Sequence, residues 1–266
     1  TYYSGVSYRH CLVVREGTTD LGNMTPPHDI SGRVVGSYLS THGNAKELIA
    51  MMKKSYDILV DHPINVARKA AGLNPANSAW FWGAGTKPAV SDFYEKTGKK
   101  GLMISAVDLL KGIAVGAHMG VAKVEGANGG LHTNYEGKAQ AALKALVEDG
   151  YDFAYIHVEA PDEMGHQGSM TDKIKAIENI DEKVLKLVVE DLKAKNIDFR
   201  LLVLPDHPTP IEVRTHTGDP VPYLLYDSTK EVCGQEFYNE KTASQTGIYW
   251  KDGYQLMGHL LEEEVC

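Results

Sequence analysis

Imidazole and carboxylate side chains gather in three short segments of the chain. Asp162 and His166 are four residues apart, and Asp206 is followed directly by His207. His216 lies a little further on, in a segment that also contains glycine and proline. Imidazole nitrogen and carboxylate oxygen are ligands of zinc, manganese and similar divalent ions. These five residues are therefore candidate metal ligands.

The spacing of the candidates indicates how they could share ions. A tight turn at Gly165 would aim Asp162 and His166 at one ion, whereas on a helix the same spacing is that of an ordinary solvated pair. Adjacent Asp206 and His207 point in different directions and could bridge toward two ions. Two divalent ions about 4 Å apart stabilise the entering and the leaving oxygen in phosphoryl transfer. One such segment alone is weak evidence, and the three together favour metal binding.

The candidate ligands follow expected strands. In the second part of the chain, hydrophobic patterning predicts strands at 101–106, 121–124, 153–158, 199–204 and 223–226. Between them it predicts helices at 107–115, 134–147 and 169–195, the last with Ser169 as its cap. Alternating strands and helices indicate an α/β fold with a mostly parallel sheet flanked by helices. Ligands bind beyond the carboxyl ends of the strands in such a sheet.

The first part of the chain predicts a smaller mixed region. A strand is expected at 8–14, and Asn44 with Glu47 has the pattern of a capping box that begins an amphipathic helix. Pro63 should restart the helix, and Gly72 should end it. Residues 1–90 carry a net charge of +3 and residues 91–266 a net charge of −11. This asymmetry favours two domains, although ordinary variation of surface charge would also explain it.

Composition excludes several classes of protein. The chain has 266 residues, a formal net charge of −8 and 43% hydrophobic residues, which is ordinary for a globular protein. The acidic balance argues against a nucleic-acid partner, and no apolar stretch reaches the roughly 18 residues of a membrane span. Three cysteines, Cys11, Cys233 and Cys266, form no CxxC pair. That usage predicts a reducing, cytoplasmic location.

At this point the motifs reveal a resemblance. Three segments are similar to the metal-binding motifs of cofactor-independent (2,3-bisphosphoglycerate-independent) phosphoglycerate mutases of the archaeal type, within the alkaline phosphatase superfamily: Ala160-Pro161-Asp162-Glu163-Met164-Gly165-His166, Leu204-Pro205-Asp206-His207-Pro208-Thr209-Pro210 and Arg214-Thr215-His216-Thr217-Gly218-Asp219-Pro220-Val221-Pro222. The similarity extends to Tyr8-Arg9, Asp61-His62-Pro63-Ile64-Asn65, Asn74-Pro75-Ala76-Asn77, Trp82-Gly83-Ala84-Gly85 and Leu110-Lys111-Gly112-Ile113. It covers nearly the whole chain.

The resemblance implies a metal-dependent isomerase of glycolysis and gluconeogenesis, acting on a small phosphorylated sugar acid. Such enzymes hold two divalent ions, manganese, zinc or magnesium. It assigns Asp162, His166 and His216 to one ion. It assigns Asp206 and His207 to the other, together with an aspartate and the nucleophilic serine of an N-terminal segment. That serine takes the phosphoryl group from 3-phosphoglycerate and returns it to give 2-phosphoglycerate, while the metals depress the pKa of its hydroxyl.

This chain departs from the family pattern at its start. Members begin with a strand, an Asp-Gly metal motif and then the nucleophile, and none of the serines here has that context. We therefore expect a fragment: residues 1–90 as the end of an inserted substrate-binding domain, and 91–266 as the C-terminal majority of the phosphatase-like domain. Alone, the chain is expected to have no mutase turnover.

Substrate contacts follow from the same resemblance. Lys111, in the first turns of a helix after a strand, is the expected catalytic phosphate ligand. Further expected contacts are Arg68, Asn65, Arg9 and His28. Pro26-Pro27-His28 replaces the Asp-Pro-His usual in archaeal-type mutases. One alternative is therefore a related phosphotransferase on another metabolite, as in a proposed homoserine kinase group. The other is a non-catalytic metal-binding module.

Overall fold

The chain folds into two structural units, of which the first contains two antiparallel strands and two α-helices. The structure, a computed structural model, describes residues 1–5, 8–230 and 234–261. It divides into the units Thr1–Pro88 and Ala89–Cys266. The sequence placed the domain boundary two residues later. Cys11 is a free and exposed thiol, whereas the other two cysteines lie outside the described residues. In the described part, no helix is long and apolar enough to cross a membrane.

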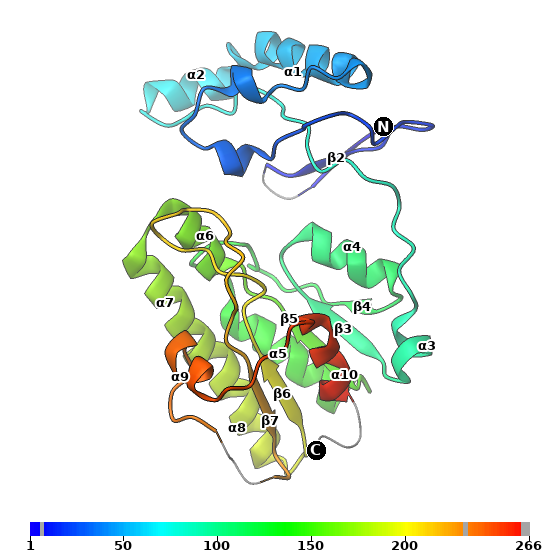
Figure 1. Cartoon of the computed structure of the whole chain (residues 1–266), viewed down its shortest axis with the longest axis vertical. Helices are drawn as coiled ribbons and strands as arrows, with labels where there is room; N and C mark the ends of the chain where they lie inside the picture. Colours follow the sequence, from blue (N-terminus) through cyan, green and yellow to red (C-terminus); the bar gives the residue numbers. More distant parts are fainter. Residues whose placement is uncertain (6–7, 231–233, 262–266) are drawn as a thin grey trace. The chain divides into compact units, whose positions relative to one another are not determined.

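The first unit is built of short elements (Figure 1). These are β1 (Tyr2–Ser4), β2 (His10–Leu12), the 3-10 helices η1 (Pro27–Ile30), η2 (Val35–Tyr38) and η3 (Gly43–Ala45), and the helices α1 (Lys46–Leu59) and α2 (Pro63–Ala70). The strand expected at 8–14 is present as β2, which pairs with β1.

The capping box predicted at Asn44 is wrong. The ring of His42 accepts a hydrogen bond from the backbone N–H of Asn44 and so caps η3, which leads into α1. The Asn44 side chain instead donates to the carbonyl of Asp20. The restart at Pro63 is confirmed, with the His62 ring as cap. Gly72 ends α2 at φ 72°, in the left-handed region that glycine adopts without strain.

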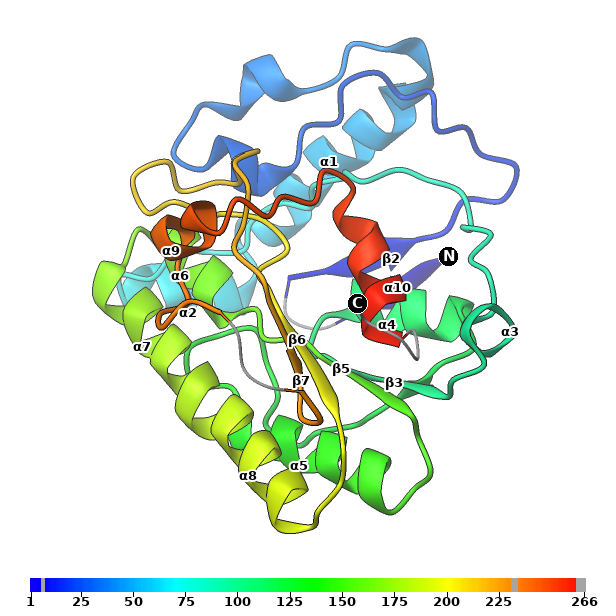
Figure 2. The same ribbon diagram turned by 60° about the horizontal axis from the view of Figure 1, so that its bottom comes forward.

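The second unit alternates strands and helices (Figure 2). Its elements are α3 (Phe93–Thr97), β3 (Gly101–Ile104), α4 (Asp108–Gly116), β4 (Gly120–Val121), α5 (Tyr135–Val147), β5 (Phe153–Ile156), α6 (Ala160–Gln167), α7 (Met170–Ile180), a π-helical turn η4 (Asp181–Leu185), α8 (Lys186–Ala194), β6 (Arg200–Val203), β7 (Leu224–Asp227), α9 (Glu240–Gln245), η5 (Gly253–Gln255) and α10 (Leu256–Leu261).

Among the described residues, three strands of the second unit form a parallel sheet in the order β4-β3-β5. Every residue of β3 is buried, as expected of a parallel strand covered on both faces. Strands β6 and β7 form a separate antiparallel pair. No described helix stands between these two strands, and a parallel pair would need such a crossover connection. The predicted α/β class is confirmed, with β6–β7 as the departure from a purely parallel arrangement.

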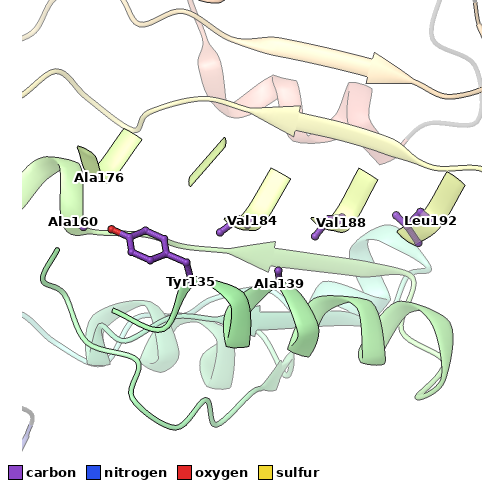
Figure 3. Packing of buried hydrophobic residues seen from close by; sticks show 7 residues of the cluster. All are labelled: Tyr135, Ala139, Ala160, Ala176, Val184, Val188 and Leu192. Atoms are coloured by element: carbon purple, nitrogen blue, oxygen red, sulfur yellow. The ribbon is translucent and has the colours of Figure 1, made fainter. Parts of the chain in front are cut away.

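The main hydrophobic core lies between α5 and the long helix that follows α6. The predicted helix at 169–195 is present as α7, η4 and α8 in continuation. Ser169 precedes it, but its hydroxyl donates to the carboxylate of Asp172 instead of capping a backbone N–H. Figure 3 shows the packed side chains of this core, which are Tyr135, Ala139, Ala160, Ala176, Val184, Val188 and Leu192. This packing fixes α5 and the start of α6 against the helix.

Candidate metal centre

Helix α6 presents two of the candidate ligands on one face. Pro161 stands in its first turn with two acidic residues, and Gly168 ends it at φ 70°. These are ordinary helix start and stop signals. The tight turn expected across Gly165 is therefore wrong, because the segment is helical. The four-residue spacing still brings the ligands together: His166 Nε2 lies 3.3 Å from Asp162 Oδ2.

The loop between β6 and β7 supplies the other candidates. In Figure 1 this loop passes beside α6. His216 Nε2 lies 3.3 Å from Asp162 Oδ1 and 3.2 Å from His166 Nε2. The His207 ring stacks on the His216 ring, with centroids 3.7 Å apart. Asp162, His207 and His216 each offer a ligand atom within 4.8 Å of the others. The structure thus brings four of the five candidates into one cluster.

Asp206 stands at the edge of this cluster. Its carboxylate is largely exposed, and Oδ2 lies 3.3 Å from His207 Nε2. Asp206 is therefore connected to the cluster through His207, the next residue in the chain. All five candidates belong to the second unit.

The donor set fits a divalent ion. His166 Nδ1 lies 2.9 Å from the carbonyl of Arg214. A carbonyl only accepts, so Nδ1 carries the proton and Nε2 keeps the lone pair that a metal needs. Metal–nitrogen bonds of about 2.0–2.1 Å place tetrahedral donors about 3.3 Å apart. The Nε2 atoms of His166 and His216 are 3.2 Å apart, and each lies 3.3 Å from one of the two oxygens of Asp162, distances that match this spacing.

Further polar groups lie near the cluster. The His157 ring lies 3.2 Å from the Ser105 hydroxyl. Burial lowers the pKa of His157, and the nearby Lys138 ammonium lowers it further. Burial also lowers the pKa of Lys173, against the opposing charge of Asp162. Burial and the charge of Asp206 both raise the pKa of Tyr155.

Lys111 lies on α4, as expected, beside a pocket of about 170 Å³. The pocket is lined by Ser105 and by a second lysine, Lys123, and lies beyond the ends of β3 and β4. The Lys111 ammonium lies 3.0 Å from Asp108 Oδ1. Two ammonium groups and a hydroxyl suit an anion.

The expected substrate contacts of the first unit differ in their surroundings. Asn65 is buried, and its amide donates to the carbonyls of Leu59 and Ala76 and accepts from the Ala76 N–H. Its amide thus holds the 74–77 loop. Arg68 donates from Nε to the carbonyl of Asn74, 2.7 Å away in the same loop. Asn65 therefore positions the loop on which Arg68 rests.

Arg9 and His28 each contact an aromatic ring. The Arg9 guanidinium lies 4.7 Å from the centre of the Tyr8 ring. His28, on η1, meets the Trp82 ring edge to face at 5.1 Å between centroids.

A family model now decides the classification. The model described as the metalloenzyme superfamily matches residues 15–263, which include every candidate ligand and every predicted substrate contact except Arg9. The chain belongs to the metalloenzyme superfamily. A metalloenzyme requires ion-binding side chains, and the cluster on α6 and the β6–β7 loop is the candidate for that role.

Relatives of this metalloenzyme superfamily chain carry a consistent name. A probable 2,3-bisphosphoglycerate-independent phosphoglycerate mutase of Geobacter sulfurreducens is 44% identical over 98% of the chain. A 2,3-bisphosphoglycerate-independent phosphoglycerate mutase of Methanosarcina barkeri is 42% identical, also over 98%. The chain spans only 65% and 66% of their respective lengths. The resemblance read from the motifs is confirmed.

A solved structure agrees with the fold. The PH0037 protein from Pyrococcus horikoshii superimposes with a TM-score of 0.61 at 32% identity. The match covers 76% of this chain and 52% of that one. The α/β architecture that carries the cluster is therefore shared with an experimentally determined structure.

Sequence reasoning missed three polar residues near the site. Thr209 stands within a quoted motif, but its contact with Asp162 depends on the fold. Lys123 has no motif of its own. Lys138 is fully buried on α5 and donates to the carbonyl of His157. The alanines at 139, 142 and 145 mark the buried face of α5, and that pattern could have shown that Lys138 lies close to it.

Proposed function

We propose that this chain is the metal-binding part of a 2,3-bisphosphoglycerate-independent phosphoglycerate mutase, which interconverts 3- and 2-phosphoglycerate through a phosphoserine. The observation that carries the proposal is the cluster of Asp162, His166 and His216, whose donor atoms have the spacing of a divalent-ion site. Two relatives with the mutase name support the choice of substrate.

In this proposal the five candidates hold two divalent ions, manganese, zinc or magnesium. Asp162, His166 and His216 would hold the first, and Asp206 and His207 would contribute to the second. The ions would supply positive charge that stabilises the phosphoryl oxygens and lowers the pKa of a nucleophilic hydroxyl. A neutral His157, hydrogen-bonded to Ser105, supports the end of β5 without adding a charge.

The chain's own side chains would bind the anionic substrate. Lys111 and Lys123, in the pocket beyond β3 and β4, would meet the phosphoryl group. In the first unit Arg68, Arg9 and His28 would bind the sugar acid, with Asn65 positioning the loop of Arg68. The first domain, 1–90, would thus serve substrate binding and the second, 91–266, metal binding. We also propose a cytoplasmic location, which the three cysteines without a CxxC pair favour.

The direct test is an assay of the natural polypeptide that contains residues 1–266. Purified protein loaded with Mn²⁺ is given 3-phosphoglycerate without 2,3-bisphosphoglycerate, and formation of 2-phosphoglycerate is followed by ³¹P NMR. We expect turnover that a chelator abolishes and added Mn²⁺ restores. Phosphorylation of homoserine from ATP without any mutase turnover would contradict the proposal and favour the phosphotransferase alternative.

A further inference from the structure

One hydroxyl joins two candidate ligands that come from different elements. Thr209, in the β6–β7 loop, is only 4% exposed. Its Oγ1 forms a hydrogen bond with Asp162 Oδ1 on α6. The same Oγ1 lies 3.4 Å from Nδ1 of His207, two residues earlier in the loop. Thr209 therefore bridges a ligand proposed for one ion and a ligand proposed for the other.

The chemistry of the three groups fixes where the protons lie. An ionised carboxylate only accepts hydrogen bonds, and a hydroxyl has a single proton to donate. The Thr209 proton therefore goes to Asp162, and only lone pairs of Oγ1 remain to face His207. His207 Nδ1 must then donate, so Nδ1 carries the ring proton. The lone pair of His207 is left on Nε2, which lies 3.3 Å from Asp206 Oδ2. Two lone pairs that face each other repel, so this arrangement is stable when a cation lies between them.

Thr209 is itself held by its backbone. Lys173 on α7 donates from Nζ to the carbonyl of Thr209 at 2.6 Å. Gly165 packs against the same residue so closely that a Cβ there would stand 2.5 Å from the Thr209 carbonyl oxygen. These contacts with α6 and α7 hold the backbone of Thr209 in place, and the side chain is thereby kept beside Asp162.

His166 shows the same arrangement with a different acceptor. The Arg214 carbonyl takes the Nδ1 proton of His166, as Thr209 Oγ1 takes that of His207. Both rings thus keep Nε2 as the ligand atom. Arg214 presents that carbonyl from a left-handed backbone conformation, φ 58°, which non-glycine residues adopt at some cost.

We propose that Thr209 is a positioning residue of the metal centre, which selects the ligand tautomer of His207 and fixes the direction of the Asp162 carboxylate. This rests on the proposed metal-binding function. Outer partners of metal ligands typically contribute 10- to 100-fold in metal affinity. A displacement of Asp162 or His207 would therefore alter the position of the other residue through its hydrogen bond with Thr209.

The first test measures Mn²⁺ affinity by calorimetric titration of the metal-free natural polypeptide. Thr209→Val keeps the side-chain shape and removes the hydroxyl, so we expect affinity to fall by roughly 10- to 100-fold. Thr209→Ser keeps the hydroxyl and should stay within about threefold of wild type. Thr171→Val, at an exposed position of α7, is the matched control and should bind as wild type.

The outcomes separate the two proposals. If the wild-type protein binds Mn²⁺ and the Thr209→Val variant binds it equally tightly, the role of Thr209 is overturned but the metal centre is not. A Thr209→Ser variant that loses as much affinity as Thr209→Val overturns that role too. A wild-type protein that binds no Mn²⁺ overturns the metal centre and, with it, the role of Thr209.

A second measurement needs no folded variant at position 209. Long-range ¹H–¹⁵N correlation spectra of the wild-type protein loaded with diamagnetic Zn²⁺ report which ring nitrogen of each neutral histidine is protonated, and His207→Gln identifies the signal of His207. We expect the tautomer with the proton on Nδ1. A proton on Nε2 overturns the proposal. Where Thr209→Val folds, its His207 signal should shift toward a mixture of the two tautomers.

Discussion

At the scale of single residues, a small number of polar contacts determines what the site can bind. The Nε2 atoms of His166 and His216 lie 3.2 Å apart, and each is 3.3 Å from a different carboxylate oxygen of Asp162. Three groups that attract cations, placed this close, favour an ion in their midst. The residue types were visible in the sequence. Their convergence was not, because it depends on how the β6–β7 loop packs on α6.

Asp162→Asn tests the carboxylate of this cluster. The amide keeps the size of the side chain but removes the charge that holds the ion, so Mn²⁺ affinity should fall by more than the 10- to 100-fold typical of outer partners. Asp181→Asn, at an exposed position of η4, is the matched control. Calorimetric titration of both variants checks the prediction, and equal affinities for the two would contradict it.

The lowered pKa of Lys138 predicts that the free energy of unfolding depends on pH. Burial lowers the pKa of this lysine to about 8 from its ordinary 10.5, although Glu159 opposes the shift. Below pH 8 the side chain is protonated in both the folded and the unfolded state. Between pH 8 and 10.5 the folded state releases the proton that the unfolded state keeps, so this lysine makes the fold more stable as pH rises.

Comparison with Lys138→Met isolates this contribution. The difference in free energy of unfolding, wild type minus variant, should increase by roughly 3 kcal/mol from pH 8 to 10.5. Lys144→Met is the control with the opposite sign, since the hydrogen bond with Asp149 raises the pKa of Lys144. Urea unfolding at several pH values measures both. A difference for Lys138→Met that stays constant with pH would show that its pKa is not lowered.

At the scale of elements, the sequence predicted more of the fold than of the local geometry. The strands of the parallel sheet and the helices α5 and α7–α8 follow from hydrophobic periodicity, which packing reinforces. Helix α6 was missed because Gly165 reads as a turn residue, yet here it permits the close approach of Thr209. His42 replaced Asn44 as a cap because the Asn44 amide binds Asp20, a long-range contact that local patterns do not contain.

Gly165→Ala tests the contact between α6 and the β6–β7 loop. The added Cβ would stand 2.5 Å from the backbone oxygen of Thr209, which cannot move without the loop. We expect a loss of about 1–3 kcal/mol in the free energy of unfolding and weaker Mn²⁺ binding, because Thr209 is displaced.

Gly112→Ala on α4 provides the matched control for that substitution. There an added Cβ meets open space among the described residues, so alanine should stabilise the helix by roughly 0.5–1 kcal/mol. Thermal and urea unfolding compare the two variants. A Gly165→Ala variant as stable as wild type would show that the loop does not rest on α6.

At the scale of the whole molecule, the two units carry different parts of the proposed function. All five candidate ligands and both core clusters of buried residues lie in the second unit. The predicted boundary near residue 90 followed from charge asymmetry and from the family resemblance. The buried Lys138 and the link through Thr209 could not be predicted, because each depends on contacts between elements far apart in the sequence.

A separate second unit should therefore keep the first ion site. Residues 89–266, expressed alone, are expected to bind Mn²⁺ within about threefold of the affinity of residues 1–266. The reason is that the three ligands, and the hydrogen bonds that orient Asp162 and His166, lie in the same unit. Calorimetry with circular dichroism as a check of folding makes the comparison. A folded second unit that binds no Mn²⁺ would contradict this division of roles.

The central claim is that Asp162, His166 and His216 hold a divalent ion. Anomalous diffraction at the manganese edge, from crystals grown with Mn²⁺, tests it most directly. We predict a strong anomalous peak within bonding distance of the Asp162 carboxylate and of the Nε2 atoms of both histidines. A map in which manganese peaks occur elsewhere, and none lies among these three side chains, would contradict the claim.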